Sequence, residues 1–311
     1  MQEADSPSLL PDQQPVEIPA PPPRPFIVSV FLGPDGLRAG WRFALYLGMF
    51  LLLSAVLGAL AKVAHPKTFP LMWRLLIGEC VALTSALIPA VVMGKIEGRR
   101  FFEYGLPLQS AFGRLFWAGA AWGLAGLTLL LGIMRGAGVF YFGHVVLHGP
   151  RVIKFAVFYV VLFLIVAFFE EFWVRGYSLF TLTKGMGFWP AAVLLSLAFG
   201  AIHLGNKNEA ITGAAAAAAI GFFLCLTLRR TGTLWFAVGF HAAWDWGETY
   251  LYSVPDSGLS MPGQLTQPSF QGKDWLTGGS VGPEGSVFVF VVVAILALIF
   301  HRLYREAKYL V

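Results

Sequence analysis

Apolar residues occur along this chain in long continuous runs rather than in short alternating stretches. The runs cover residues 41–63, 70–94, 112–134, 153–182, 189–204, 211–229, 233–252 and 286–303. A helix that spans a bilayer needs about 20 mainly apolar residues, and its backbone hydrogen bonds must close within the lipid. Continuous runs favour helices over the alternating strands of a membrane barrel. The pattern predicts an all-α polytopic membrane protein, a bundle of about eight transmembrane helices.

Composition supports this class. The chain has 311 residues, of which 57% are hydrophobic and 13% are charged, whereas soluble domains carry about 25% charged residues. The net charge of +5 is small for a nucleic-acid binder, so we expect membrane lipid and no nucleic acid as a partner. Basic residues concentrate on one side of the bundle if the N-terminus lies inside. We therefore expect an integral protein of the cytoplasmic (inner) membrane with both termini in the cytoplasm.

Three segments fall outside the apolar runs. Residues 1–30 are polar and proline-rich, which is typical of a disordered cytoplasmic tail. Residues 31–311 then form the eight-helix transmembrane domain, with the candidate functional core at about 153–252. The apolar but glycine-broken segment 136–150 is expected at the membrane interface. Residues 253–285, rich in glycine, serine and proline, are expected to form a long extracytoplasmic loop without regular structure, as a lid, a rim or a plain connection.

Three charged residues interrupt the most apolar part of the run 153–182. Glu171 and Arg175 are four residues apart, with the acid first, which is the favourable order for an ion pair on one helical face. Glu170 is rotated by about 100° from Glu171 and has no cation nearby in its own helix. Because a lone buried carboxylate is costly, Glu170 is expected to meet a partner on another helix or to hold a proton.

Three further ionisable residues lie in later runs. His203 follows Phe199 by one helical turn, so the two rings share a face. His241 and Asp245 are also one turn apart, a spacing that suits an Asp that orients a His, two ligands of one metal, or a structural hydrogen bond. His203 likewise allows a structural interpretation as a buried, hydrogen-bonded core residue.

Depth in the bilayer relates these residues to one another. At 1.5 Å per residue, Glu170 lies about 18 Å and His203 about 21 Å from the inner ends of their helices. The corresponding depths are about 12 Å for His241 and about 18 Å for Asp245. Polar groups from three helices therefore share one band, which favours a single constellation over scattered structural polar residues.

Three motifs at these positions resemble those of a known family. "EEFWVR" (170–175), "FGAIH" (199–203) and "HAAWD" (241–245) are similar to the EExxxR, FxxxH and HxxxN/D motifs of the CPBP family. These are intramembrane proteases, also called the Abi or type II CAAX prenyl endopeptidase family. Each motif is weak alone, but three in order, each in its own span, form a strong signal. The resemblance implies a helical bundle with an intramembrane catalytic cavity and hydrolysis of a peptide bond by a glutamate-dependent endopeptidase.

The resemblance also implies residue roles. Glu170 would be the general base that activates water, His203 would help to hold the water, and His241 with Asp245 would stabilise the oxyanion. Supporting roles would fall to Glu171, Arg175 and Phe199. Asp245 departs from the family pattern, because the best-understood eukaryotic members look to have asparagine at this position. An ionised Asp cannot donate a hydrogen bond to an oxyanion, so Asp245 would either be protonated or orient His241.

Other functions remain open from the sequence. The predicted hydrolysis needs no cofactor, but Glu170, His203 and His241 also offer a ligand set for zinc. A non-catalytic membrane immunity or scaffold protein, or a proton-coupled transporter, would also place ionisable residues in its spans. The substrate is expected to be a membrane-associated protein or peptide, with or without a lipid anchor.

Overall fold

The structure, a computed structural model, describes residues 25–34, 36–64, 69–206 and 210–309. The chain divides into two units, residues 1–38 and 39–311. Most of the predicted tail lies outside the described residues. Its end differs from the prediction, because residues after the last proline of the cluster form helix α1 (Phe26–Phe31) and a short antiparallel pair, β1 (Leu32–Gly33) with β2 (Gly36–Leu37). The run "FIVSVF" has no proline to prevent the helix.

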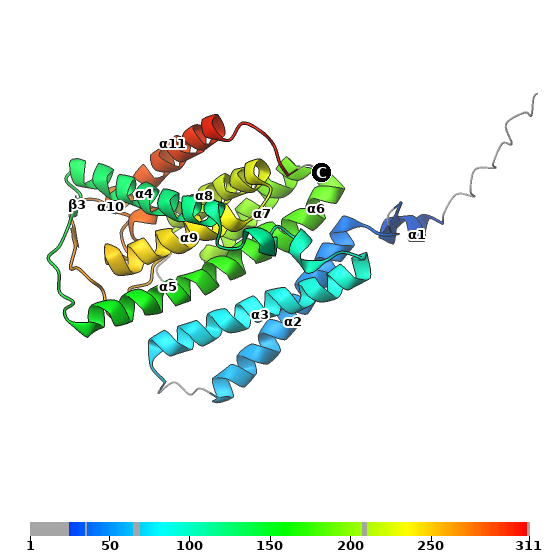
Figure 1. Cartoon of the computed structure of the whole chain (residues 1–311), viewed down its shortest axis with the longest axis horizontal. Coiled ribbons are helices and arrows are strands. Elements are labelled where there is room, and N and C mark those ends of the chain that lie inside the picture. Colours follow the sequence, from blue (N-terminus) through cyan, green and yellow to red (C-terminus); the bar gives the residue numbers. More distant parts are fainter. Residues whose placement is uncertain (1–24, 35, 65–68, 207–209, 310–311) are drawn as a thin grey trace, which may run out of the picture. The chain divides into compact units, whose positions relative to one another are not determined.

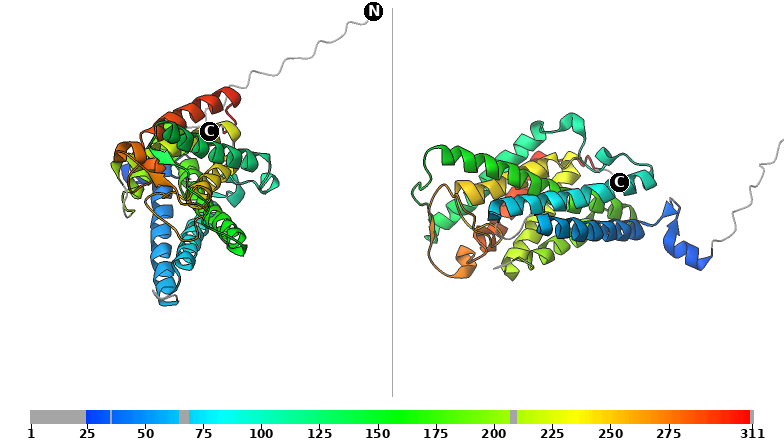
Figure 2. Two further views of the ribbon diagram at one scale, coloured as in Figure 1. Left: turned by 90° about the vertical axis from the view of Figure 1, so that its left-hand side faces the viewer. Right: turned by 90° about the horizontal axis from the view of Figure 1, so that it is seen from below.

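The second unit is a bundle of helices (Figures 1 and 2). Its longer elements are α2 (Ala39–Ala64), α3 (Leu71–Glu97), α4 (Arg114–Gly136), α5 (Pro150–Glu171), α6 (Leu179–Met186), α7 (Phe188–His203), α8 (Ile211–Thr231), α9 (Trp235–Trp246) and α11 (Phe288–Leu303). The α5–α6 stretch is continuous apart from a π-helical turn, so these elements match the eight predicted apolar runs. The described chain holds five helices long and apolar enough to cross a membrane and two shorter apolar ones. The predicted all-α polytopic membrane fold is confirmed, and this is an integral membrane protein.

Glycines allow α4 and α9 to pack backbone against backbone. A Cβ atom at Gly123 of α4 would lie 2.2 Å from the carbonyl oxygen of Phe240, and one at Gly119 would lie 2.0 Å from that of Phe236. From the other side, a Cβ at Gly239 of α9 would lie 2.1 Å from the carbonyl oxygen of Phe116. Small residues at four-residue spacing permit this approach in membrane helices. The contact fixes α9, which carries His241 and Asp245.

Helices α7 and α8 approach each other in the same way. A Cβ atom at Gly200 would lie 2.3 Å from the carbonyl oxygen of Ala214, so the alanine-rich start of α8 packs directly on the end of α7. This close packing places His203, the last residue of α7, beside the bundle interior.

The long α5–α6 stretch changes its winding directly after Glu171. Residues Phe172–Ser178 form the π-helical turn η3, and Gly176 leaves the helical region there with φ −80° and ψ −112°. A second π-helical turn, η4 (Gly247–Leu251), follows α9. Wide turns of this kind are rare and are frequently found at functional sites.

The loop 253–285 is ordered, contrary to the prediction of a structureless link. It contains β4 (Ser269–Phe270), the short helix α10 (Asp274–Thr277) and the 3₁₀ turn η5 (Pro283–Gly285). Strand β4 pairs with β3 (Phe140–Tyr141) in the segment 136–150, with Phe140 opposite Phe270. Backbone hydrogen bonds such as that from Gly258 N to the Val281 oxygen, at 2.9 Å, replace the regular pairing that the composition lacks. The loop is therefore an ordered part of one end of the bundle.

Candidate active site

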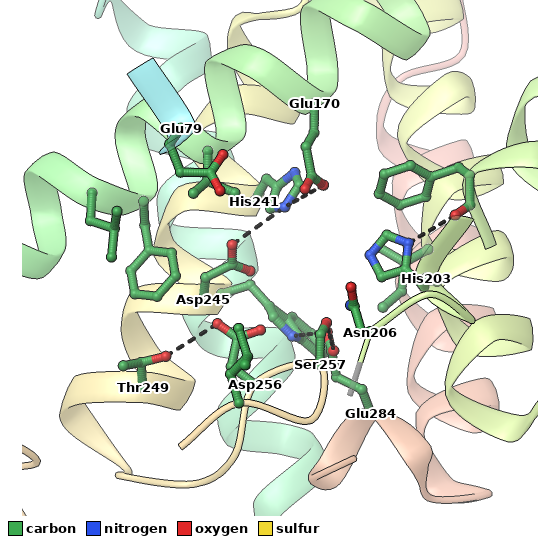
Figure 3. Close-up of a pocket in the computed structure, with 18 of the residues that line it drawn as sticks. Glu79, Glu170, His203, Asn206, His241, Asp245, Thr249, Asp256, Ser257 and Glu284 are labelled. Atoms are coloured by element: carbon green, nitrogen blue, oxygen red, sulfur yellow. Dashed lines mark hydrogen bonds and ion pairs between the residues drawn. The ribbon is translucent and has the colours of Figure 1, made fainter. Parts of the chain in front are cut away.

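A cavity of about 210 Å³ lies between helices α3, α5, α7, α8 and α9, and loop 253–285 closes one side of it (Figure 3). All four predicted catalytic residues, Glu170, His203, His241 and Asp245, line this cavity. The structure therefore brings together residues from three helices that the sequence places up to 75 positions apart. Apolar side chains such as Leu162, Phe163 and Val166 form much of the remaining wall.

The predicted ion pair between Glu171 and Arg175 is present. Arg175 Nη1 donates to Glu171 Oε1 at 2.6 Å, and both side chains are fully buried. Arg175 also donates through Nε to the carbonyl oxygen of Gly221 at 3.2 Å and lies over the ring of Phe199, 5.0 Å from its centre. Gly221 makes room for the guanidinium, because a Cβ there would lie 2.7 Å from Nη2. Phe199 thus supports Arg175 on one face.

His241 connects this pair with the cavity. Its Nδ1 lies 2.9 Å from Glu171 Oε1, while Nε2 lies 3.6 Å from Glu170 Oε2 and 3.4 Å from Asp245 Oδ2. The arginine favours the ionised form of Glu171, and a carboxylate only accepts hydrogen bonds, so Nδ1 carries a proton and donates it to Glu171. The ring is thereby held with Nε2 between Glu170 and Asp245. We call Glu170, Glu171, Arg175 and His241 the ion-paired cluster.

Adjacent residues 170 and 171 have different surroundings, as their rotation on the helix predicts. Glu171 is fully buried in its pair with Arg175, whereas the side chain of Glu170 is 23% exposed and lines the cavity. The imidazole beside Glu170 belongs to His241, on another helix. Glu170 is thus the carboxylate that remains available to a molecule in the cavity.

His203 faces the cavity from the opposite side. Its Nδ1 lies 2.8 Å from the carbonyl oxygen of Phe199, and the two rings pack edge to face with centres 4.5 Å apart. Since a carbonyl oxygen can only accept, Nδ1 carries the proton, and the Nε2 of the neutral ring is an acceptor. Figure 3 shows this second nitrogen directed into the cavity, across from Glu170.

Two features of the site were not predicted. The bond between Glu171 and His241 joins residues 70 positions apart, so no spacing rule could reveal it. The loop and neighbouring elements also contribute polar lining residues, namely Glu79, Asn206, Thr249, Asp256, Ser257 and Glu284. Of these, Glu79 lies on α3.

Carboxylates beside the cavity offer a location for a cation that differs from the zinc ligand set considered above. Among the described residues, the group of three whose ligand atoms lie within 4.8 Å of one another is Glu248, Asp256 and Glu284. The predicted set of Glu170, His203 and His241 is not such a group.

The family comparison covers the helices that carry the motifs. Residues 152–247 match the model of the family described as type II CAAX prenyl endopeptidase, Rce1-like. The predicted family resemblance is confirmed over this segment. The Rce1-like segment includes all three motifs and every predicted site residue, and it ends just before Glu248. A comparison with curated proteins finds no match. At family level, the match supports a CAAX-type intramembrane protease.

Proposed function

We propose that the protein is a glutamate-dependent intramembrane endopeptidase whose general base is Glu170. The observation that carries the proposal is the position of His241. Its Nδ1 is bonded to Glu171, and its Nε2 lies between Glu170 and Asp245 at the cavity. A base, an oriented imidazole and a second imidazole across the cavity can supply the proton transfer and the oxyanion stabilisation that peptide hydrolysis by water uses.

In the proposed reaction, a water molecule between Glu170 and His203 donates one hydrogen to each. Glu170 takes a proton as the water oxygen attacks the carbonyl carbon of the peptide. His241, as the imidazolium, donates through Nε2 to the oxyanion while Nδ1 remains bonded to Glu171. Glu170 then returns its proton to the departing amine, so that one water and one peptide bond give a carboxylic acid and an amine.

Asp245 takes the orienting role in this scheme rather than that of an oxyanion donor. Its Oδ2 lies 3.4 Å from His241 Nε2, a position from which an ionised carboxylate can only accept. Asp245 would hold the charged ring until the oxyanion forms.

The substrate of the proposed reaction is a membrane-associated protein or peptide, with or without a lipid anchor. The apolar walls formed by Leu162, Phe163, Val166 and Leu224 favour an apolar segment beside the scissile bond. The termini are proposed to lie in the cytoplasm, because one end of the bundle is rich in basic residues. At that end Arg42 pairs with Glu97, and the backbone N of Lys308 donates to the carbonyl oxygen of Arg229. A reporter fused to the C-terminus that is active only outside the cytoplasm should stay inactive, and activity would contradict this orientation.

The experiment compares the termini of membrane proteins in cells that carry the wild type or Glu170→Gln. New termini present only with the wild type are expected, and peptides spanning those sites should then be cleaved by purified protein. Glu170→Gln should reduce that cleavage by about 10²–10⁴-fold, the usual contribution of a general base. Glu103→Gln, in the exposed 3₁₀ turn η1 (Phe101–Glu103), is the matched control and should retain activity.

Undiminished cleavage by a folded Glu170→Gln variant would overturn the assignment of the base. Identical termini in the two cell lines, with an intact phenotype, would favour a non-catalytic scaffold or transport protein instead. The zinc alternative is separated by elemental analysis of the purified protein and by activity in a zinc-selective chelator with Ca²⁺ in excess, where the proposed reaction proceeds unchanged.

A further inference from the structure

Three carboxylates form an acidic cluster, Glu248, Asp256 and Glu284, beside the cavity and outside the Rce1-like segment. Glu248 comes from η4, Asp256 from the chain just after it, and Glu284 from η5. One oxygen of each carboxylate lies within 4.8 Å of the other two. Figure 3 shows Asp256 and Glu284 on the side of Asp245 away from Glu170.

Only neutral donors hold two of these carboxylates in place. Thr249 Oγ1 donates to Asp256 at 3.1 Å. Glu284 accepts one bond at each oxygen, from the Trp244 indole at 3.0 Å and from the Ser257 hydroxyl at 3.0 Å. Within the described residues, no Lys, Arg or His nitrogen lies within 4.0 Å of the acidic cluster, since the ion pairs there involve other groups. The carboxylates are therefore oriented but not neutralised by the protein.

Glu248 provides an independent indication of a ligand. Its side chain is fully buried, and neither carboxylate oxygen has a hydrogen-bond partner among the described residues. A buried carboxylate that makes no hydrogen bond is among the costliest polar groups a protein can hold. One oxygen of Glu248 nevertheless lies within 4.8 Å of an oxygen of each of the other two carboxylates, where ionised forms would repel one another.

We propose that Glu248, Asp256 and Glu284 bind one hard divalent cation, with Ca²⁺ as the preferred ion. Ca²⁺ takes oxygen ligands at about 2.3–2.6 Å in flexible geometry, so carboxylate oxygens spread over 4.8 Å can contact one ion. The donors from Thr249, Ser257 and Trp244 would orient the ligands, as hydrogen-bonded residues around metal sites do. Water from the cavity would complete the coordination shell.

The location gives the site a structural role next to the candidate active site. Glu248 follows α9 without a break, two turns of chain beyond His241, while Asp256 and Glu284 belong to the ordered loop. A cation held by all three would tie the end of α9 to both ends of that loop. It would also offset negative charge beside Asp245.

The test measures Ca²⁺ binding to the full-length chain, purified in detergent and stripped with chelator. Equilibrium dialysis with radioactive Ca²⁺ at neutral pH should give one ion per chain, with a dissociation constant on the order of 10⁻⁴–10⁻³ M, as in the weaker Ca²⁺ sites of extracellular modules. Saturating Ca²⁺ should also raise the melting temperature by several degrees, because an ion that binds only the folded state stabilises it. Mg²⁺ in a parallel arm should bind more weakly, since it demands a stricter octahedral geometry.

Glu248→Gln should weaken Ca²⁺ binding at least about tenfold, since it removes a charged ligand while keeping the side-chain shape. Asp274→Asn is the matched control, because Asp274 is an exposed acid of the same loop, and it should leave binding unchanged. Glu284→Gln is the second variant, used if Glu248→Gln does not elute as a folded species.

Two results would overturn the proposal. One is the absence of saturable Ca²⁺ binding to the wild type at millimolar concentration, in which case the carboxylates share protons instead. The other is equal Ca²⁺ affinity of the wild type and both Glu→Gln variants, which would place the ion elsewhere. Both measurements are independent of peptide cleavage, so they do not depend on the proposed protease activity.

Discussion

Two groups of buried acids border the same cavity and are stabilised in different ways. In the ion-paired cluster, Glu171 bonds to Arg175 at 2.6 Å and to His241 at 2.9 Å, so each buried charge has an opposite charge in contact. In the acidic cluster, the donors are hydroxyl and indole groups, and Glu248 has no bond at either oxygen. In the first cluster the positive charge of Arg175 lies within the protein, although Glu171 Oε2 and Arg175 Nη2 make no hydrogen bond among the described residues. The second lacks positive charge, which is why we expect a ligand there.

The largest expected effect follows from breaking the ion-paired cluster on one side only. Arg175→Met should destabilise the folded protein by about 3–5 kcal/mol, because it leaves the carboxylate of Glu171 buried beside a single histidine. The measurement is thermal unfolding in detergent. Arg114→Met, at the exposed start of α4, should change stability little.

The double variant Glu171→Gln with Arg175→Met separates a lost charge balance from lost packing. It should recover much of the stability, since neither charge then remains buried alone. If Arg175→Met alone is as stable as the wild type, the pair contributes little and the contrast between the two clusters disappears.

A smaller effect is expected from the helix contact that serves both clusters. Gly123→Ala places a methyl group where the carbonyl oxygen of Phe240 lies 2.2 Å away, so α9 must move. The cost should be about 1–3 kcal/mol, typical of overpacking. Because α9 carries His241 and leads into Glu248, peptide cleavage and Ca²⁺ binding should weaken together.

Gly132→Ala is the control for this helix. No atom lies within 4 Å of a Cβ built at Gly132, and alanine is the better helix former, so stability should stay equal or rise by about 0.5–1 kcal/mol. If Gly123→Ala impairs cleavage but leaves Ca²⁺ binding intact, α9 does not couple the two clusters.

The parts of the structure that depend on local sequence were predictable. Eight apolar runs identified the helices because lipid imposes a length and a composition on each span. The Glu171–Arg175 pair followed from one helical turn, as did the different surroundings of Glu170. These relations involve residues within a few positions of one another, and helix geometry fixes them before the helices pack.

Contacts between distant segments were not predictable in this way. The bond from His241 to Glu171 depends on how α5 and α9 face each other, and glycine contacts such as that of Gly239 with α4 set that arrangement. Loop 253–285 has the composition of an irregular segment, yet its pairing with residues 136–150 orders it. The acidic cluster went unnoticed because Glu248, Asp256 and Glu284 meet only through that ordered loop.

The smallest expected effect is a pH dependence that originates in the loop. Burial raises the pKa of the Asp256 carboxyl well above its usual value, and the nearby carboxylates of Asp245 and Glu284 raise it further. Burial and Asp245 likewise raise the pKa of Glu284. The other titratable groups around the two acids are Glu248, His203 and His241.

The sign of the dependence follows from these pKa shifts. The folded state holds these protons more tightly than the unfolded state, whose carboxyls titrate near pH 4, so stability should fall as the pH rises above about 4 toward the raised pKa values. Melting temperatures in chelator across this range should therefore decline with pH, more steeply for the wild type than for Asp256→Asn. Saturating Ca²⁺ should flatten the decline, because the ion stabilises the ionised carboxylates.

The contradicting outcome is a wild-type melting temperature in chelator that changes with pH as little as that of Asp256→Asn. The carboxylates of the acidic cluster would then be stabilised in some other way, and the contrast with the ion-paired cluster would be lost.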